Sequence, residues 1–113
     1  MKAYTDIEQS KKLAEILPLE SADMYYNPYL NDEDWYDIPN FGEADLNFNE
    51  LPCWSLAVLL DALPYPSLHK TFSGWRCDSH NEEGTSCIFG EPSDNQIDAC
   101  YEMILKLHEL NLL

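Results

Sequence analysis

The segment PCWSLAVLLDAL, residues 52–63, places the strongest constraint on how this chain can fold. It is apolar at almost every position, so a helix formed by it has no polar face to turn toward water and must be buried. Pro64 and Pro66 follow it, and proline cannot continue a helix because it lacks the amide hydrogen. We therefore expect a buried helix over residues 52–63.

Amphipathic helices are expected near both ends of the chain. The run TDIE, residues 5–8, has the pattern of a capping box, in which a hydroxyl and a carboxylate satisfy free amides at a helix start. Apolar residues at helical spacing follow until Pro18, which predicts a helix over residues 6–17. The run SDNQ, residues 93–96, repeats the capping pattern, and the periodicity after it predicts a helix over residues 94–110.

The run GWRCDSHNEEGTSCIFGEP has the composition of a β-hairpin with a turn at residues 81–84. Pairing Ser79 with Thr85 would gather the large apolar and sulfur-bearing side chains on one face. Those side chains are Trp75, Cys77, Cys87 and Phe89. We therefore expect a hairpin at residues 75–89 in this register.

The residues that lead into this hairpin carry two of the six basic side chains of the chain. We expect Phe72 to point into the core, and Lys70 and Arg76 to lie at the surface among the surplus of carboxylates. Replacing either cation with alanine should then change the free energy of unfolding by less than about 1 kcal/mol.

Together these elements predict a single α+β domain over residues 1–113, with about three helices packed on a short antiparallel sheet. A chain of 113 residues buries roughly two thirds of its unfolded surface, so it needs no metal ion or disulfide to fold. Proline, glycine and asparagine interrupt residues 19–51, a stretch rich in carboxylates and aromatic side chains. We expect an irregular acidic segment there, with one short strand, held on the core by its aromatic residues.

The chain carries 21 acidic and 6 basic residues, a formal net charge of −15 at pH 7. This field repels phosphate backbones and anionic lipids, so we expect neither direct nucleic-acid binding nor membrane binding. The start MKAYTDIEQSKK lacks the apolar core of a signal peptide, and the longest apolar run, residues 56–60, is far shorter than a membrane span. We therefore expect a cytoplasmic protein whose four cysteines are free thiols.

The acidic segment is the main candidate for a binding site. Lys and Arg are absent between residues 13 and 69, while carboxylates and aromatic residues alternate there. The candidate partner-binding residues are Asp32, Glu33, Asp34, Trp35 and Asp37. A basic protein is the partner that this charge fits. A sharper version is nucleic-acid mimicry, in which spaced carboxylates take the place of phosphates.

An alternative site lies within residues 69–87. Imidazole and thiolate are ligand types that zinc takes, and the chain offers His69, Cys77, His80 and Cys87 there. Because no CxxC pair is present, we favour the interpretation that the cysteines pack as small apolar residues. Cys77 as a nucleophile beside His69 or His80 is a further interpretation. An enzyme ranks last among these classes, and no cofactor is expected.

The runs LPCWSLAVLLDALPYPSLHKTFSGWRCDSHNEEGT and DACYEMILKLHELNLL are similar to small uncharacterised acidic proteins from gut-bacterial genomes and their phages or mobile elements. The likeness covers the whole chain and is closest from residue 51 onward. It implies no catalytic or binding residue, since that family has no known activity, and it implies an accessory role in a phage or mobile element. The sequence thus predicts a non-enzymatic acidic interaction or accessory protein. The alternative is a small-ligand or zinc-binding protein that uses residues 69–87.

Overall fold

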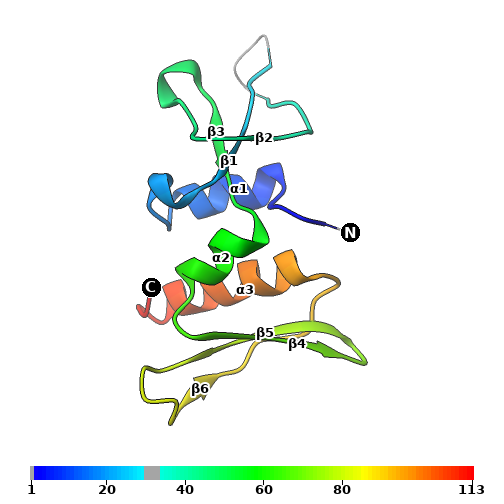
Figure 1. Cartoon of the computed structure of the whole chain (residues 1–113), viewed down its shortest axis with the longest axis vertical. Coiled ribbons are helices and arrows are strands. Elements are labelled where there is room, and N and C mark those ends of the chain that lie inside the picture. The colour runs from blue at the N-terminus through cyan, green and yellow to red at the C-terminus, as the bar shows by residue number, and fades with distance from the viewer. Residues whose placement is uncertain (1, 30–33) are drawn as a thin grey trace. The chain divides into compact units, whose positions relative to one another are not determined.

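The computed structural model describes residues 2–29 and 34–113, which fold into two compact units. The N-terminal unit is Tyr4–Val58, and the C-terminal unit is Leu59–Leu113 together with the start of the chain up to Ala3. The described residues form three α-helices and two three-stranded antiparallel sheets (Figure 1). This confirms the predicted α+β class. That the chain behaves as one domain stays a prediction.

The N-terminal unit is built on a sheet in the order β2-β1-β3. Its central strand is β1, Met24–Tyr26, flanked by β2, Asn40–Phe41, and β3, Leu51–Cys53. Strand alternation turns Met24 and Tyr26 inward, and helix α1, Ile7–Ala14, packs against β3. The buried cluster of this unit is Met24, Tyr26, Leu51 and Cys53, and Tyr4, Ile7 and Trp35 pack against it.

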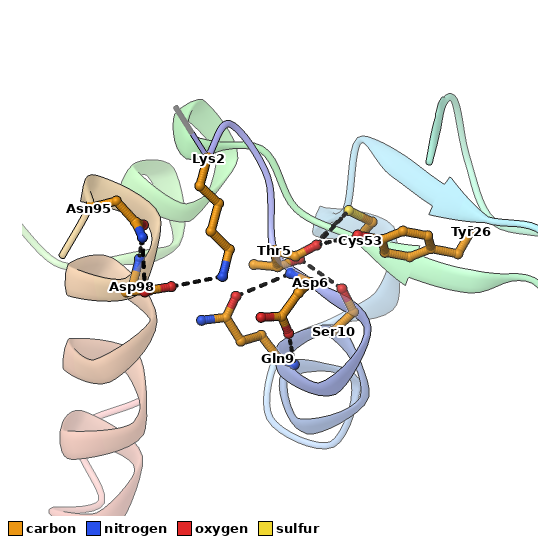
Figure 2. A network of polar contacts seen from close by, with 9 residues as sticks. All are labelled: Lys2, Thr5, Asp6, Gln9, Ser10, Tyr26, Cys53, Asn95 and Asp98. Atoms are coloured by element: carbon orange, nitrogen blue, oxygen red, sulfur yellow. Dashed lines mark hydrogen bonds and ion pairs between the residues drawn. The ribbon is translucent and has the colours of Figure 1, made fainter. Parts of the chain in front are cut away.

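Thr5 is fully buried and is the polar centre of this unit. Figure 2 shows it among Ser10, Tyr26 and Cys53. Its hydroxyl oxygen accepts a hydrogen bond from the amide of Trp54 at 3.1 Å and lies 2.8 Å from the hydroxyl of Ser10. Its carbonyl oxygen accepts a 2.7 Å hydrogen bond from the phenol of Tyr26. Burial raises the pKa of Tyr26, so this donor keeps its proton. The one residue therefore links α1, β1 and the end of β3.

This use of Thr5 explains why the first helix begins one residue later than its capping pattern predicts. The N-cap of α1 is Asp6, whose carboxylate accepts from the amide of Gln9 at 2.8 Å. The Gln9 side chain in turn accepts from the amide of Asp6 at 3.1 Å, which completes a capping box at positions 6 and 9. The helix ends at Ala14 rather than at residue 17.

The predicted buried helix at 52–63 is wrong in its first part. Residues 51–53 form strand β3, with Cys53 opposite Met24, and helix α2 covers only Leu56–Ala62. Within α2 only Leu59 is fully buried, and the boundary between the two units falls inside this helix. A short apolar run is compatible with a strand or a helix. Its first residues form a strand because they pair with β1.

The C-terminal unit has a sheet in the order β4-β5-β6. Strand β5, Gly74–His80, lies between β4, Pro66–Thr71, and β6, Cys87–Ile88. Helix α3, Gln96–Glu109, packs against β5, and Asn95 caps it by accepting from the amide of Asp98 at 2.9 Å (Figure 1). The residues that α3 buries are Ile97, Ala99, Cys100, Met103, Ile104 and Leu107. This helix agrees closely with the predicted range.

No helix in residues 2–29 or 34–113 is long and apolar enough to cross a membrane.

The predicted register of the 75–89 hairpin is also wrong. Strand β5 pairs along its whole length with β4, from Pro66 opposite Ser79 to Thr71 opposite Gly74. On its other side β6 places Ile88, rather than Thr85, opposite Ser79, and Cys87 opposite His80. The longer loop is closed by the Asn81 carboxamide, which accepts from the amides of residues 85 and 86 at 2.9 and 3.2 Å. The alternation of apolar and polar residues cannot predict that a side chain, here the Asn81 carboxamide, takes the place of a backbone hydrogen-bond partner.

Trp54 should be among the most important side chains for stability. It is fully buried after β3, and its indole donates a 3.0 Å hydrogen bond to the hydroxyl of Ser21. Trp54→Ala is expected to lower the free energy of unfolding by about 3–5 kcal/mol. Urea denaturation would measure this, with Phe48→Ala, an exposed ring in the same unit, as the control. Equal midpoints for the two variants would contradict the prediction.

Candidate functional site

One face of the β4–β5 hairpin gathers polar side chains. Because side chains alternate along a strand, Cys77 turns toward α3, where its thiol meets that of Cys100. Arg76 and Asp78 then share the opposite face, and the register places His69 directly across from Arg76. We call this set, completed by Ser67 opposite Asp78, the polar face of the hairpin.

Asp78 is the centre of the polar face and is 2% exposed. One carboxylate oxygen, Oδ2, accepts from the Arg76 guanidinium at 3.0 Å and lies 3.3 Å from Nε2 of His69. The other, Oδ1, accepts from the backbone amide of Gly90 at 3.0 Å. A buried carboxylate is tolerated only with such partners, so these contacts fix the segment after β6 on the hairpin.

The segment after β6 approaches β5 so closely that its contact residue, Gly90, has no room for a side chain. A Cβ atom added to Gly90 would collide with the carbonyl group of Cys77. The neighbouring Phe89 is 62% exposed, and its ring centroid lies 5.6 Å from the Arg76 guanidinium carbon. Arg76 is therefore held between a carboxylate and an aromatic ring.

Two expectations for this region are corrected by these contacts. Arg76 does not lie at the surface against distant carboxylates, because it pairs with Asp78 two residues along its own strand. Phe72 does not point into the core: it occupies the turn between β4 and β5 and is fully exposed. Lys70 is exposed as expected, with its ammonium 5.8 Å from the ring centroid of Trp75.

Ser67, His69 and Asp78 do not form a catalytic triad, although the residue types match. In a triad the serine meets one ring nitrogen of the histidine and the carboxylate meets the other. Here the Ser67 hydroxyl lies 2.7 Å and the Asp78 carboxylate 3.3 Å from the same atom, Nε2 of His69. The carboxylate therefore cannot hold the ring in the tautomer that would activate the serine.

The four candidate zinc ligands are divided among three places. Cys77 is fully buried beside Cys100, while His69 contacts Asp78. His80 lies opposite Cys87 in the β5–β6 register, with 3.9 Å between Nε2 and Sγ. Across the described parts of the chain, no group of three or more His, Cys, Asp or Glu side chains is placed to hold a metal ion.

The thiols are also poorly placed for nucleophilic catalysis. The hydrogen bond with Cys100 lowers the pKa of the candidate nucleophile Cys77, but this thiol is fully buried on the face of β5 opposite to that of His69. The hydrogen bond with Cys77 and burial both raise the pKa of Cys100. Burial and the charge of Asp78 raise the pKa of Cys87, even though His80 is its neighbour. A raised pKa lowers the thiolate fraction at neutral pH, and the thiolate is the reactive form.

Two hollows in the C-terminal unit have the volume of a small-ligand site: one of about 530 Å³ between residues 90–93 and the end of α3, and one of about 320 Å³. The lining residues of the smaller hollow are Pro64, Ser79, His80, Asn81, Ser86, Ile88, Leu107 and Leu112. The Ser79 hydroxyl already donates to the carbonyl oxygen of Pro64, and the Asn81 carboxamide closes its own loop. Ligand pockets need polar groups that can orient the ligand, so the smaller hollow gives the small-ligand alternative little support.

The predicted partner-binding residues lie in or beside the described part of the acidic segment. Asp34 and Asp37 are exposed, while Asp32 and Glu33 lie outside the described residues. Trp35 is half-buried: its indole donates to the carbonyl oxygen of Asn49 at 2.9 Å, and the Lys11 ammonium lies 5.2 Å from its ring centroid. Trp35 thus holds the segment on its unit, and its part in binding stays a prediction.

Sequence reasoning missed the exposed apolar residues that follow. Four large side chains are more than half exposed within eleven positions: Ile38 at 77%, Phe41 at 82%, Leu46 at 55% and Phe48 at 69%. The carboxylates of Asp37 and Glu43 are exposed in the same stretch. We call residues 37–48 the acidic apolar surface. Its apolar residues follow neither a strand nor a helix period, and that irregular spacing is the signal that they lack a common buried face.

Comparison with known proteins found no matching family model, no similar curated protein and no similar solved structure.

Arg76 should matter more for stability than the equally charged Lys70. Arg76→Ala leaves the buried Asp78 carboxylate without its closest cation and should lower the free energy of unfolding by about 2–3 kcal/mol. Lys70→Ala, the matched control on the facing strand, should cost less than about 1 kcal/mol. Chemical denaturation of both variants measures the difference. Equal losses would mean that the Asp78 contacts do not hold the hairpin.

Folding should not depend on a metal ion or on oxidation. The four candidate ligands are divided among three places, and all four cysteines are free. We expect the thermal unfolding midpoint to be the same with and without a strong chelator, and with and without a thiol reductant. A midpoint that falls by many degrees with chelator would restore the zinc site of His69, Cys77, His80 and Cys87.

Proposed function

We propose that this chain is a non-enzymatic interaction protein whose acidic apolar surface, together with Asp34, receives a basic protein partner. The observation that carries this proposal is the exposure of Ile38, Phe41, Leu46 and Phe48 among carboxylates. Large apolar side chains exposed together are uncommon on soluble proteins and mark interaction surfaces.

The two kinds of side chain would have different tasks in such a complex. Carboxylates attract a basic partner and raise its association rate, because the field of a chain with charge −15 extends beyond its surface. Burial of Phe41 and Phe48 would then supply most of the affinity, since aromatic residues dominate binding energies at interfaces. Nucleic-acid mimicry is the narrower form of this proposal, in which the partner is a DNA-binding protein and Asp32, Glu33, Asp34 and Asp37 stand for phosphates.

The setting completes the proposal. The resemblance drawn from the sequence suggests an accessory protein of a gut-bacterial phage or mobile element. Four free cysteines suit the reducing cytoplasm, which is the compartment that we propose.

Removing the charges of the acidic segment should slow complex formation. The variant Asp32→Asn, Glu33→Gln, Asp34→Asn, Asp37→Asn loses four charges with little change in shape. The partner would be captured with the immobilised wild-type chain and purified, and its association rate measured over a range of salt concentrations. We expect slower association for the variant and a weaker dependence on salt.

A control variant separates a local effect from the loss of net charge. Glu91→Gln, Asp94→Asn, Glu102→Gln, Glu109→Gln removes four exposed carboxylates from the C-terminal unit. It should associate faster than the first variant. If both variants slow association equally, or if the wild-type chain captures no basic protein, the acidic segment is not the binding surface.

A further inference from the structure

Strand β4 is an edge strand with unpaired backbone groups. Strand β5 occupies one side of it, and no other strand of the described residues pairs with its second side. The direction of each backbone group follows from neighbouring bonds. The amide of His80 donates to the carbonyl oxygen of Tyr65, whereas Trp75 exchanges hydrogen bonds with Ser93, away from β4.

These bonds fix which residues of β4 face outward. In an antiparallel pair, residues alternate between those bonded to the neighbour and those pointing away. Since Trp75 bonds away from β4, its partner Lys70 directs its own amide and carbonyl toward the free side, and so does Leu68. Pro66 contributes only a carbonyl group there, because proline has no amide hydrogen.

Exposed aromatic side chains lie at both ends of this edge. Phe72, in the turn, is fully exposed, and Tyr65, just before the strand, is 56% exposed. The turn is held by the Thr71 hydroxyl, which accepts from the amide of Ser73 at 3.2 Å and donates to the carbonyl oxygen of Gly74 at 2.8 Å. A ring exposed on a bonded turn is an anchor that loses little freedom on binding.

The charge of this region is opposite to that of the rest of the chain. Residues 62–78 contain two cations, Lys70 and Arg76, and one carboxylate, Asp78, so they carry +1 while the remaining residues carry −16 of the total −15. Arg76 and His69 both contact Asp78, which leaves Lys70 as the exposed cation beside the free edge. The edge therefore favours an acidic guest.

We infer that the free edge of β4 binds an extended acidic segment of a partner protein by strand addition. Backbone groups of Leu68 and Lys70 pair with the guest strand, its carboxylates meet Lys70, and Phe72 and Tyr65 pack on its ends. Strand addition obtains affinity from main-chain bonds and specificity from alternate side chains. A second copy of β4 fits less well, since antiparallel pairing places a Lys70 of each copy in the same short sheet, where like charges repel.

A synthetic peptide tests this edge with the whole chain. The probe is a fluorescein-labelled hexapeptide of alternating valine and glutamate, and fluorescence anisotropy measures its binding. Two control peptides carry lysine in place of glutamate, or N-methyl groups on alternate residues. The lysine peptide loses the charge contacts, and the N-methylated peptide loses the backbone hydrogen bonds to β4. Each control should therefore bind at least about tenfold more weakly. Equal binding of all three peptides overturns the inference.

Variants of the chain locate the peptide. Leu68→Pro removes an outward amide but no bond to β5, and Lys70→Glu reverses the edge charge; each should weaken binding of the acidic peptide about tenfold. Lys12→Glu, in the N-terminal unit, is the matched control and should leave binding unchanged. If Leu68→Pro fails to fold, the inference is tested by Lys70→Glu, Phe72→Ala and the N-methylated peptide, each of which should still show weaker binding.

Two results would assign the edge differently and overturn the inference. Loss of binding in Lys70→Glu with full binding in Leu68→Pro and of the N-methylated peptide would indicate charge attraction without strand pairing. A dimer of the wild-type chain in sedimentation experiments, abolished by Leu68→Pro, would indicate that a second copy occupies the edge.

Discussion

A single buried carboxylate organises the C-terminal unit. Among the described residues Asp78 is the one charged side chain that is buried, and it receives a guanidinium, a backbone amide and an imidazole contact. Each partner comes from a different part of the chain: Arg76 from β5 itself, His69 from β4, and Gly90 from the segment after β6. Removing a charge from water costs several kcal/mol unless such contacts compensate, so the arrangement of all three segments follows from this requirement. Arg76 and His69 are thereby explained as structural groups, whereas Lys70 takes no part in these contacts.

The types of secondary-structure element were predicted well from the sequence, and the residues at which they begin and end were predicted less well. The helix of residues 94–110 was predicted almost at its observed bounds, because its cap and its apolar period agree. The first helix was displaced by one residue because Thr5 serves the core, where its hydroxyl accepts from the amide of Trp54, and Asp6 caps the helix instead. The register of the hairpin was wrong for a related reason. A carboxamide that closes the 81–86 loop and a charge that requires burial both outweigh the grouping of large side chains.

The candidate surfaces show a similar division. Charge is countable, so an acidic surface facing a basic partner could be proposed from composition alone. The exposure of a side chain cannot be counted from the sequence. Phe41 and Trp35 are both aromatic residues in one acidic segment, yet Phe41 is 82% exposed and Trp35 packs on the core. The difference depends on partners distant in sequence, such as the carbonyl group of Asn49 that receives the indole of Trp35. Such contacts leave no period in the sequence, and Phe72 was misassigned to the core for the same reason.

The strong net charge also bears on why an open edge strand is tolerable. Unpaired strand edges promote aggregation, and proteins protect them with charges, proline or a covering element. Here β4 begins with Pro66 and carries Lys70, but the outward backbone groups of Leu68 and Lys70 have no strand partner among the described residues. Copies of a chain with charge −15 repel one another before their edges meet, especially at low ionic strength. The same field does not oppose a guest whose carboxylates reach the local cations, provided that its own net charge is small. An acidic strand within an otherwise neutral or basic partner fits both conditions.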